Sequence, residues 1–344
     1  MPLRLYNTFS KKEETFASRE PGIVRMYTCG PTVYGRPHIG NYASFLTADL
    51  LRRWLEVSGY TVLHVKNITD VGHLVRDADR GDDKVEIQAK KEKKDPLEVA
   101  RKYEAEYLED ELALNILQEY VARPRATETI PEMLAIIRTL LANSNAYETE
   151  DGIYYSVQSF PGYGKLSGNT LDKLGKLQPA GPLGSTRGKL RPSEGREGVR
   201  ETLELSETKK HPADFALWKK CVGENQDHIL RWSFETGERV HGVGEDPAAG
   251  FPGWHIECSA MSSKYLGPEL DIHTGGEDNI FPHHECEIAQ SEAAFGKTFV
   301  RYWLHKRRVN FGAPSAGSGQ APKMSKSLGN ILTLPDIVKK GFHA

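Results

Sequence analysis

The sequence lacks the features that mark membrane, secreted or strongly basic proteins. No apolar run approaches the roughly 20 residues that span a bilayer, and the stretch from Met1 to Phe16 has no apolar core of the signal-peptide kind. The 45 Lys and Arg residues nearly balance the 47 Asp and Glu residues, so the composition carries no nucleic-acid footprint. We therefore expect a cytoplasmic protein without a membrane partner, and any nucleic-acid partner must be argued from the site.

Cysteine is also scarce. The 344 residues contain four cysteines, Cys29, Cys221, Cys258 and Cys286, which are too few and too widely spaced for a disulfide scaffold. In a cytoplasmic chain we expect buried thiols or metal ligands instead. The length fits one large domain that carries an insertion, or two domains.

The first part of the chain has the pattern of a parallel α/β sheet. Ile23 to Cys29 reads as a buried strand, Asn41 to Ser58 has helical periodicity, and Tyr60 to Val65 reads as a second strand. A strand, turn, helix and strand in this order open a parallel sheet with helices packed against it. Ligands bind at the carboxyl ends of such strands, where Cys29 and His38 both fall.

The rest of the chain mixes helices, a hairpin and an insertion. The pattern predicts helices within 82–115 and over 130–143, and a hairpin over 146–157. Residues 174–210 are rich in Gly, Pro, Ser and charge without apolar periodicity, which indicates a flexible surface insertion. We expect the parallel sheet to resume around Asp214 to Trp218 and to end with a strand over 299–304.

Pro37, His38, Ile39, Gly40 and Asn41 stand at the start of the first predicted helix. A helix N-terminus offers unpaired N–H groups and a partial positive charge, which suit a phosphate. Gly40 lets a nucleotide approach the backbone, and His38 can donate to a phosphate oxygen. Taken alone, a His-Ile-Gly tripeptide at a helix start is more often structural.

A second basic motif runs from Lys323 to Ser327, beyond a glycine-rich stretch. Lys323 and Lys326 are three residues apart and could close over a triphosphate, where they would neutralise the charge of a leaving pyrophosphate. Taken alone, the motif reads as a solvated basic loop. The first motif precedes a split α/β sheet and the second follows it. Together the two motifs resemble the signature pair of the class I aminoacyl-tRNA synthetases.

Three further stretches narrow this resemblance. Tyr27 to Tyr34 precedes the first motif, Gly253 to Met261 lies in the middle, and Asp271 to Glu287 follows. With these stretches the chain resembles the cysteinyl-tRNA synthetases over essentially its whole length, least across the predicted insertion. The resemblance implies a Rossmann-like parallel sheet with helices on both faces, split by an inserted connective domain. It divides the chain into a first catalytic half over 1–120, a connective insertion over 121–212 with its flexible segment 174–210, a second catalytic half with a zinc site over 213–310, and a mobile lysine-rich loop followed by the start of a truncated helical region over 311–344.

The resemblance also implies one zinc ion per chain, held by Cys29, Cys258, His283 and Glu287. The residues themselves agree, because His283 and Glu287 are four apart and share a helix face, and Cys29 ends a central strand. Two thiolates, an imidazole and a carboxylate make a plausible tetrahedral zinc site. His284, Glu285 and Cys286 are neighbouring alternatives, and any one cysteine alone could be a small buried hydrophobe.

The family's remaining site residues carry over onto matching positions. Cys29, Gly30, Thr69 and Trp254 correspond to the substrate pocket, where zinc would bind the thiolate of cysteine and discriminate against serine without an editing site. Thr69 and Trp254 could instead be ordinary turn or core packing. The ATP-binding set is Pro37, His38, Gly40, Asn41, Gly275, Gly276, Asp278 and Lys326, and the catalytic set is His38, Lys323 and Lys326.

The implied activity is a cysteine–tRNA ligase. The carboxylate of L-cysteine attacks the α-phosphate of ATP, supplied with Mg²⁺, and the cysteinyl-adenylate is then passed to tRNA(Cys). Two departures stand out: Asn41 replaces the second histidine of the family's His-Ile-Gly-His, and the chain ends before the family's anticodon-reading region. Two alternatives remain, a cysteine ligase of mycothiol synthesis that acts on glucosaminyl-inositol, and a non-catalytic cysteine- or nucleotide-binding paralogue. We expect a monomer.

Overall fold

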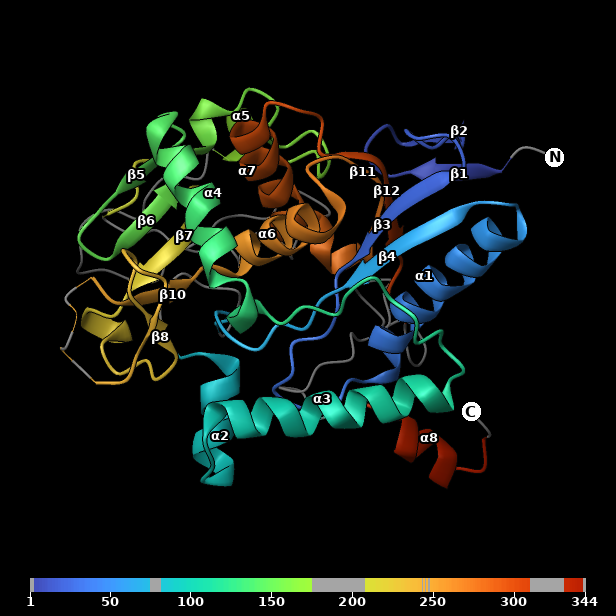
Figure 1. The fold of residues 1–344 in the computed structure, drawn as a ribbon, viewed down its shortest axis with the longest axis horizontal. Coiled ribbons are helices and arrows are strands. Elements are labelled where there is room, and N and C mark those ends of the chain that lie inside the picture. Colours follow the sequence, from blue (N-terminus) through green and yellow to red (C-terminus); the bar gives the residue numbers. More distant parts are fainter. Residues whose placement is uncertain are drawn as a thin grey trace, which may run out of the picture.

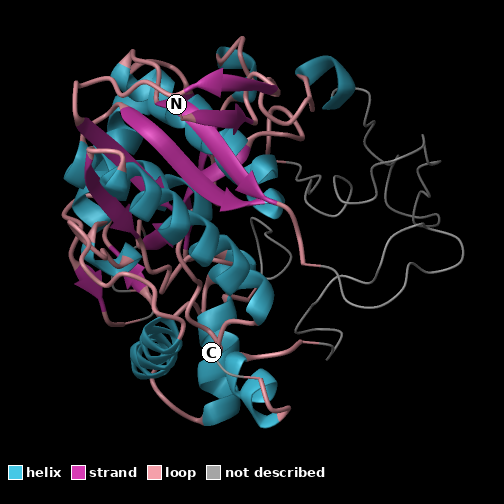
Figure 2. Ribbon diagram, turned by 90° about the vertical axis from the view of Figure 1, so that its right-hand side faces the viewer, coloured by secondary structure: helices cyan, strands magenta, loops and turns pink. Residues whose placement is uncertain are grey.

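Four parallel strands form the sheet on which the candidate site is built (Figure 1). In spatial order they are β12 (Val300–Lys306), β11 (Leu270–Gly276), β3 (Ile23–Thr28) and β4 (Thr61–Lys66). Figure 2 shows the long strands running side by side. The computed structural model describes residues 3–74, 82–174, 208–309 apart from 243, 245 and 247, and 331–342.

Helices cover both faces of this sheet, as the sequence predicts. Successive side chains of a strand point to opposite faces. Met26 and Ile272 face α1 (Ile39–Val57) and pack in one cluster with its Ala48 and Leu55. Tyr27 and Trp303 point to the opposite face of the sheet. There they pack with Cys258 and Met261 of α6 (Trp254–Leu266). The split Rossmann-like architecture is therefore confirmed.

A second sheet is antiparallel. It orders β5 (Ala146–Glu148), β6 (Gly152–Tyr155), β7 (Phe215–Lys220), β10 (Gly250–Pro252), β8 (Arg231–Trp232) and β9 (Arg239–Val240). The hairpin predicted over 146–157 is confirmed, since β5 and β6 pair antiparallel. The expectation that the parallel sheet resumes around Asp214 to Trp218 is wrong. This segment is β7, which pairs antiparallel with β6 and β10, and the parallel sheet resumes only at β11. The apolar pattern of a strand indicates that it is buried but does not specify the strand with which it pairs.

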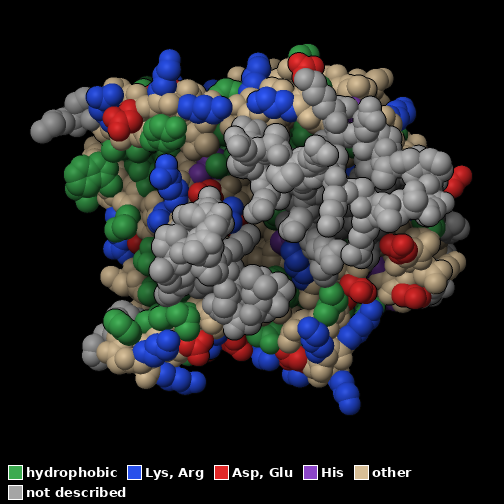
Figure 3. All heavy atoms as spheres, turned by 180° about the vertical axis from the view of Figure 1, so that it is seen from behind, with side chains coloured by type: hydrophobic (Ala, Val, Ile, Leu, Met, Phe, Trp, Pro, Cys, Tyr) green, Lys and Arg blue, Asp and Glu red, His purple; other side chains and the backbone are tan. Residues whose placement is uncertain are grey.

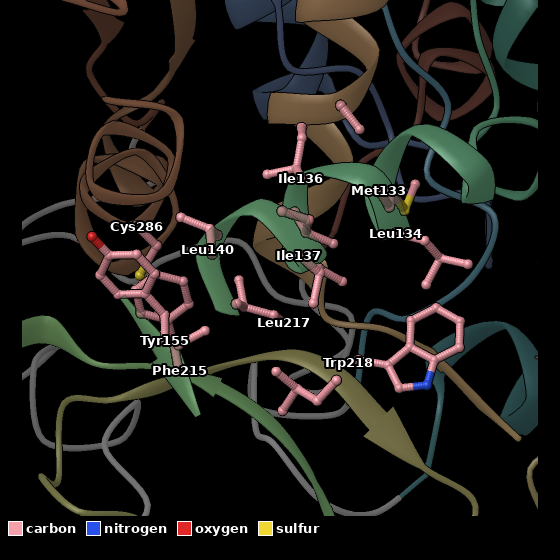
Figure 4. Packing of buried hydrophobic residues seen from close by; sticks show 14 of the residues in the cluster. Met133, Leu134, Ile136, Ile137, Leu140, Tyr155, Phe215, Leu217, Trp218 and Cys286 are labelled. Atoms are coloured by element: carbon pink, nitrogen blue, oxygen red, sulfur yellow. The ribbon is translucent and has the colours of Figure 1, made fainter. Parts of the chain in front are cut away.

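Three helices lie between the two sheets. α4 (Ile130–Ala142) presents Met133, Ile137 and Leu140, spaced three and four apart, to the antiparallel sheet. Figure 4 shows these side chains against Phe215, Leu217 and Trp218, with Cys286 of α7 (Glu285–Phe295) at the edge of the cluster. α6 and α7 contribute to the same cluster, so the core is continuous from one sheet to the other.

The other described α-helices and strands lie around the two sheets and the helices between them. They are the hairpin of β1 (Arg4–Asn7) and β2 (Lys12–Thr15), and the helices α2 (Lys84–Glu92), α3 (Pro96–Ala113), α5 (Leu171–Leu174) and α8 (Leu334–Lys339). α2 and α3 confirm the helices expected within 82–115. Among the described residues, none of the helices has the length and apolar character to cross a membrane. The flexible segment predicted over 174–210 lies almost wholly outside the described residues, and so does the lysine-rich loop.

Candidate functional site

A pocket opens where the carboxyl ends of the parallel strands meet the start of α1. Many of the residues that the sequence singled out line it: Cys29, Gly30, His38, Gly40, Asn41, Thr69, Trp254, Cys258, Gly276, Asp278 and His283. Seen from behind, histidine side chains are visible in small gaps of the face, with Lys and Arg side chains beside them and along the edges (Figure 3). Segments from both halves of the chain therefore converge on one cavity.

Some predicted residues stand elsewhere. Pro37 and Gly275 are outside the pocket lining, although His38 and Gly276 beside them belong to it. A Cβ on Gly275 would come within 2.7 Å of the His284 ring, so close packing alone requires glycine there. Lys323 and Lys326 lie outside the described residues. Glu287 lies behind the lining, within the ligand group described below.

The start of α1 is built by His38 and Asn41. His38 has extended backbone angles at the N-cap, and its N–H donates to Oδ1 of Asn41 at 3.0 Å. The N–H of Ile39 donates to the carbonyl of Leu332 at 2.9 Å, so one donor of the first turn is already used. This bond also ties the chain that follows the lysine-rich motif to the helix that carries the first motif.

Four buried side chains form a potential metal site. The ligand atoms of Cys29, Cys258, His283 and Glu287 all lie within 4.8 Å of one another. Sγ of Cys258 lies 3.9 Å from Sγ of Cys29 and 3.4 Å from Nε2 of His283, which lies 3.1 Å from Oε1 of Glu287. Cys29 follows β3, Cys258 comes from α6, and His283 and Glu287 come from the irregular turn Ile280–His284 and from α7.

The charges of this group fit a divalent cation. Burial raises the pKa of the Cys29 and Cys258 thiols, and it raises the pKa of Glu287 to about 7. Burial also lowers the pKa of His283 to about 3, which keeps the imidazole neutral and able to ligate. Three acidic groups crowded into one dry space oppose one another's ionisation, and a dication would favour all three anions. Two sulfurs, one nitrogen and one oxygen are a donor set that suits zinc.

A second group shares two of these ligands. Cys29, His273, His284 and Glu287 also bring their ligand atoms within 4.8 Å of one another. Nε2 of His284 lies 3.2 Å from Sγ of Cys29, and Nε2 of His273 lies 3.0 Å from Oε2 of Glu287. Cys258 and His283 line the pocket, whereas His273 and His284 do not, so the first group is the one that a ligand in the pocket would meet.

The imidazole of His283, one of the four potential ligands, is oriented by a second histidine. Its Nδ1 shares a 3.0 Å hydrogen bond with Nδ1 of His255, which leaves Nε2 directed at Cys258 and Glu287. Metal-binding histidines are usually oriented in this way by a partner on the second nitrogen. The ring of His283 also stacks on Trp254, with centroids 4.2 Å apart.

Trp254 is itself part of a three-ring stack. His73 covers its other face, with centroids 4.2 Å apart and planes 9° from parallel. Nδ1 of His73 is 2.7 Å from the hydroxyl of Thr32, and both residues line the pocket. His73 was not predicted from the sequence as a site residue. Only its position four residues after Thr69 could have drawn attention to it.

A chain of hydrogen bonds joins the pocket wall to a buried carboxylate. The N–H of Gly30 donates to Oδ1 of Asn67 at 2.8 Å, Nδ2 of Asn67 donates to Oγ1 of Thr69 at 3.1 Å, and this hydroxyl donates to Oε2 of Glu257 at 3.0 Å. Burial raises the pKa of Glu257 well above its usual range. Asn67 and Glu257 were also not predicted, although Asn67 lies two residues before Thr69 and Glu257 directly precedes Cys258.

The far side of the pocket is basic. Lys306, the last residue of β12, and the following Arg307 and Arg308 line the cavity beside Gly276 and Asp278. Nε of Arg308 is 3.2 Å from Oδ1 of Asp278. Three successive cations at the end of an edge strand could have been noticed in the sequence. They suit an anionic ligand such as a nucleotide.

Comparison with known proteins identifies relatives of this chain. Residues 15–343 match the family described as tRNA synthetases class I (C) catalytic domain. The cysteine–tRNA ligase of Chlorobium luteolum is 44% identical over 339 residues, which cover 98% of this chain and 61% of that protein. The cysteine–tRNA ligases of Thermus thermophilus and Pyrococcus horikoshii are 44% and 43% identical and are covered over 61% and 60% of their length. The chain thus spans about three-fifths of the length of these relatives.

A solved structure has the same fold. Methionyl-tRNA synthetase of Mycobacterium tuberculosis, in complex with methionyl-adenylate, aligns with a TM-score of 0.58 over 93% of this chain and 62% of that chain. The sequence identity is 15%, so this likeness supports the architecture alone.

Proposed function

The chain belongs to the class I tRNA synthetase (C) catalytic-domain family, and from this premise we propose that it activates L-cysteine with ATP and transfers it to tRNA(Cys). The observation that carries the proposal is the buried group of Cys29, Cys258, His283 and Glu287 beside a pocket for an anionic ligand. A site that binds only a nucleotide would not need two thiols and a carboxylate at its inner end.

Zinc is the proposed occupant of this group. When bound, zinc would supply a soft Lewis acid that takes the thiolate of cysteine and binds the hydroxyl of serine only weakly. His255 keeps Nε2 of His283 directed at the site, and Trp254 covers the imidazole face. These residues fix the position of the substrate side chain, so selection rests on the metal ligand set rather than on pocket size.

ATP is proposed to lie between the start of α1 and the basic end of β12. Gly40 and Asn41 would meet phosphate oxygens, Gly276 and Asp278 would lie beside the ribose and adenine, and His38 would donate to a phosphate. Lys323 and Lys326, outside the described residues, would neutralise the pyrophosphate as it leaves. Mg²⁺ would accompany the nucleotide. Holding the cysteine carboxylate against the α-phosphate supplies most of the rate in this proposal.

The alternatives differ in the molecule that accepts the activated cysteine. All the relatives named above are cysteine–tRNA ligases, which favours tRNA(Cys) over glucosaminyl-inositol. A purely binding paralogue would have no need of the lysine pair that the sequence retains. The ligase is therefore the reading that uses all the motifs.

The test is cysteine-dependent exchange of pyrophosphate into ATP, with serine offered as a competitor. Exchange that requires cysteine and is unaffected by serine supports activation through the proposed zinc site. Absence of exchange in a zinc-containing preparation would refute it. Offering tRNA(Cys) and the amino-sugar separately then identifies the acceptor, and transfer to the sugar alone would replace tRNA in the proposal.

A further inference from the structure

We propose that Asp110 is a positioning residue for the nucleotide motif at the start of α1. Asp110 lies on α3 and is not part of the pocket lining, but its carboxylate binds residues on both sides of the motif 37–41. It thereby fixes the backbone on which His38, Gly40 and Asn41 reach the pocket. The inference rests on the proposed function, because it takes the ligand of that backbone to be ATP.

Three hydrogen bonds converge on the carboxylate of Asp110. Nε of Arg36 donates to Oδ2 at 2.9 Å, and Nη2 of the same guanidinium donates to Oδ1 at 2.7 Å. The hydroxyl of Tyr42 also donates to Oδ2, at 2.8 Å. A guanidinium can only donate, and burial and the neighbouring Asp110 raise the pKa of Tyr42, so the phenol keeps its proton. All three bonds therefore run toward the carboxylate.

The two donors flank the motif in the chain. Arg36 directly precedes it and Tyr42 directly follows it, so one side chain of another helix ties both ends of a five-residue segment. The pair of parallel bonds from Arg36 fixes the orientation of the guanidinium as well as its distance. Between the two donors the chain turns from extended backbone at His38 into the helix, and this turn brings Gly40 to the pocket wall.

Burial makes the carboxylate of Asp110 an effective anchor. Its side chain is 3% exposed, against 27% for that of Arg36, and Tyr42 is also buried. A buried carboxylate keeps its donors, because losing them would leave a desolvated charge without compensation. The ring of Tyr42 also stacks with Tyr107 of α3, with centroids 6.3 Å apart and planes 13° from parallel. α3 therefore holds the first turn of α1 through a polar and an aromatic contact.

The rest of α1 is anchored separately. Asp49, in the middle of the helix, accepts from the N–H of Leu117 at 2.9 Å and from Nε of Arg53 at 2.7 Å. The inner face of the helix packs in the core cluster against the parallel sheet. Loss of the bonds to Asp110 should therefore displace the motif without detaching the helix.

The experiment measures ATP binding by calorimetry and the kinetics of pyrophosphate exchange for wild type and for Asp110→Asn, which keeps the size and removes the charge. Displacing a binding group by about 1 Å can cost on the order of 100-fold in rate, so we expect kcat/KM for ATP to fall, and Kd for ATP to rise, at least about tenfold. KM for cysteine and the zinc content should stay those of wild type, because the four proposed zinc ligands come from other elements.

The matched control is Asp49→Asn, which also removes a buried carboxylate bonded to an arginine but acts on the body of α1. This control should leave the kinetics of both substrates unchanged. Equal losses for ATP and cysteine, unchanged ATP kinetics in Asp110→Asn, or the same ATP defect in Asp49→Asn would each overturn the proposal, since a merely structural role gives these results.

Should Asp110→Asn fail to fold, two milder variants take its place. Arg36→Lys keeps the charge but loses the two parallel bonds, and Tyr42→Phe keeps the ring but loses the hydroxyl. Each must raise KM for ATP and leave KM for cysteine unchanged, and a wild-type KM for ATP in both overturns the proposal.

The two proposals can fail separately. If ATP binding weakens in Asp110→Asn but the wild type shows no cysteine-dependent exchange, the ligase function is overturned and the role of Asp110 is kept. Exchange in the wild type, with the same ATP kinetics in Asp110→Asn, does the reverse.

Discussion

Oδ1 of Asn41 accepts the backbone N–H of His38 at 3.0 Å, and this bond caps the helix that carries the first nucleotide motif. A backbone N–H can only donate, so the amide oxygen must be the atom that faces it. Nδ2 of Asn41 is therefore the atom that can donate to a ligand in the pocket, which Asn41 lines. One side chain therefore has two separable roles, a cap and a donor.

Substituting Asn41 should separate these roles. Asn41→Asp keeps the capping oxygen and loses the donor, so we expect stability within about 0.5 kcal/mol of wild type but a higher KM for ATP because a carboxylate would face the phosphates. Asn41→Ala loses both, and should also unfold about 1 kcal/mol more easily. Thermal unfolding and exchange kinetics measure the two effects. Equal ATP affinity in Asn41→Asp and wild type would show that Asn41 is only a cap.

Removing one of the proposed ligands should abolish the proposed zinc binding. Cys258→Ala leaves three ligands in the group, and we expect the zinc content to fall from about one per chain to a small fraction, with loss of cysteine-dependent exchange. The matched control is Cys286→Ala, because Cys286 is equally buried but lies against Tyr163 in the core and in neither ligand group. This control should keep its zinc. Metal analysis of both proteins after dialysis decides the point, and full zinc content in Cys258→Ala would exclude Cys258 as a ligand.

The metal-free protein should lose stability as pH rises through about 7. Burial raises the pKa of Glu287 to about 7, so its protonated form is favoured on folding, and that contribution is complete below the unfolded value near 4.5 and lost above 7. The shift corresponds to a loss on the order of 3 kcal/mol. Zinc binding must displace this proton, so zinc affinity should instead rise with pH.

Glu287→Gln is the reference for this prediction because glutamine does not titrate. Chelator-treated wild type and Glu287→Gln are unfolded with urea at several pH values between 5 and 8. We expect the free energy of unfolding of wild type to fall relative to that of the variant across this range. Parallel pH curves would mean that Glu287 is ionised throughout.

Local patterns in the sequence predicted the first strands and helices well. α1 and β4 follow from periodicity and from the residues that bound them, and the Cys29, Cys258, His283 and Glu287 group follows from motifs. The sheet to which β7 belongs did not follow, because strand pairing depends on contacts far along the chain. For the same reason His273 and His284 were not seen as a second ligand group. Their approach to Cys29 exists only once β3, β11 and α7 are assembled.

Trp254 should support both the substrate and the proposed ligand His283. It is held between the rings of His73 and His283, each with a centroid 4.2 Å away, and its side chain lines the pocket. Trp254→Ala removes two stacks worth about 1 kcal/mol each to the stability of the protein and takes away part of the pocket wall, so we expect the free energy of unfolding to fall by about 2 kcal/mol and KM for cysteine to rise. Trp254→Phe keeps a smaller ring and should lie between Ala and wild type.

The same substitution should also loosen the metal, because His283 loses the ring that fixes its plane while its bond to His255 remains. Zinc release to a chelator, followed in wild type, Trp254→Phe and Trp254→Ala, should quicken in that order. Trp232→Phe, a buried tryptophan of β8 outside the pocket lining, controls for general loosening of the fold and should release zinc at the wild-type rate. A raised KM with unchanged zinc release would assign Trp254 to the substrate alone, and faster release with unchanged KM would assign it to His283.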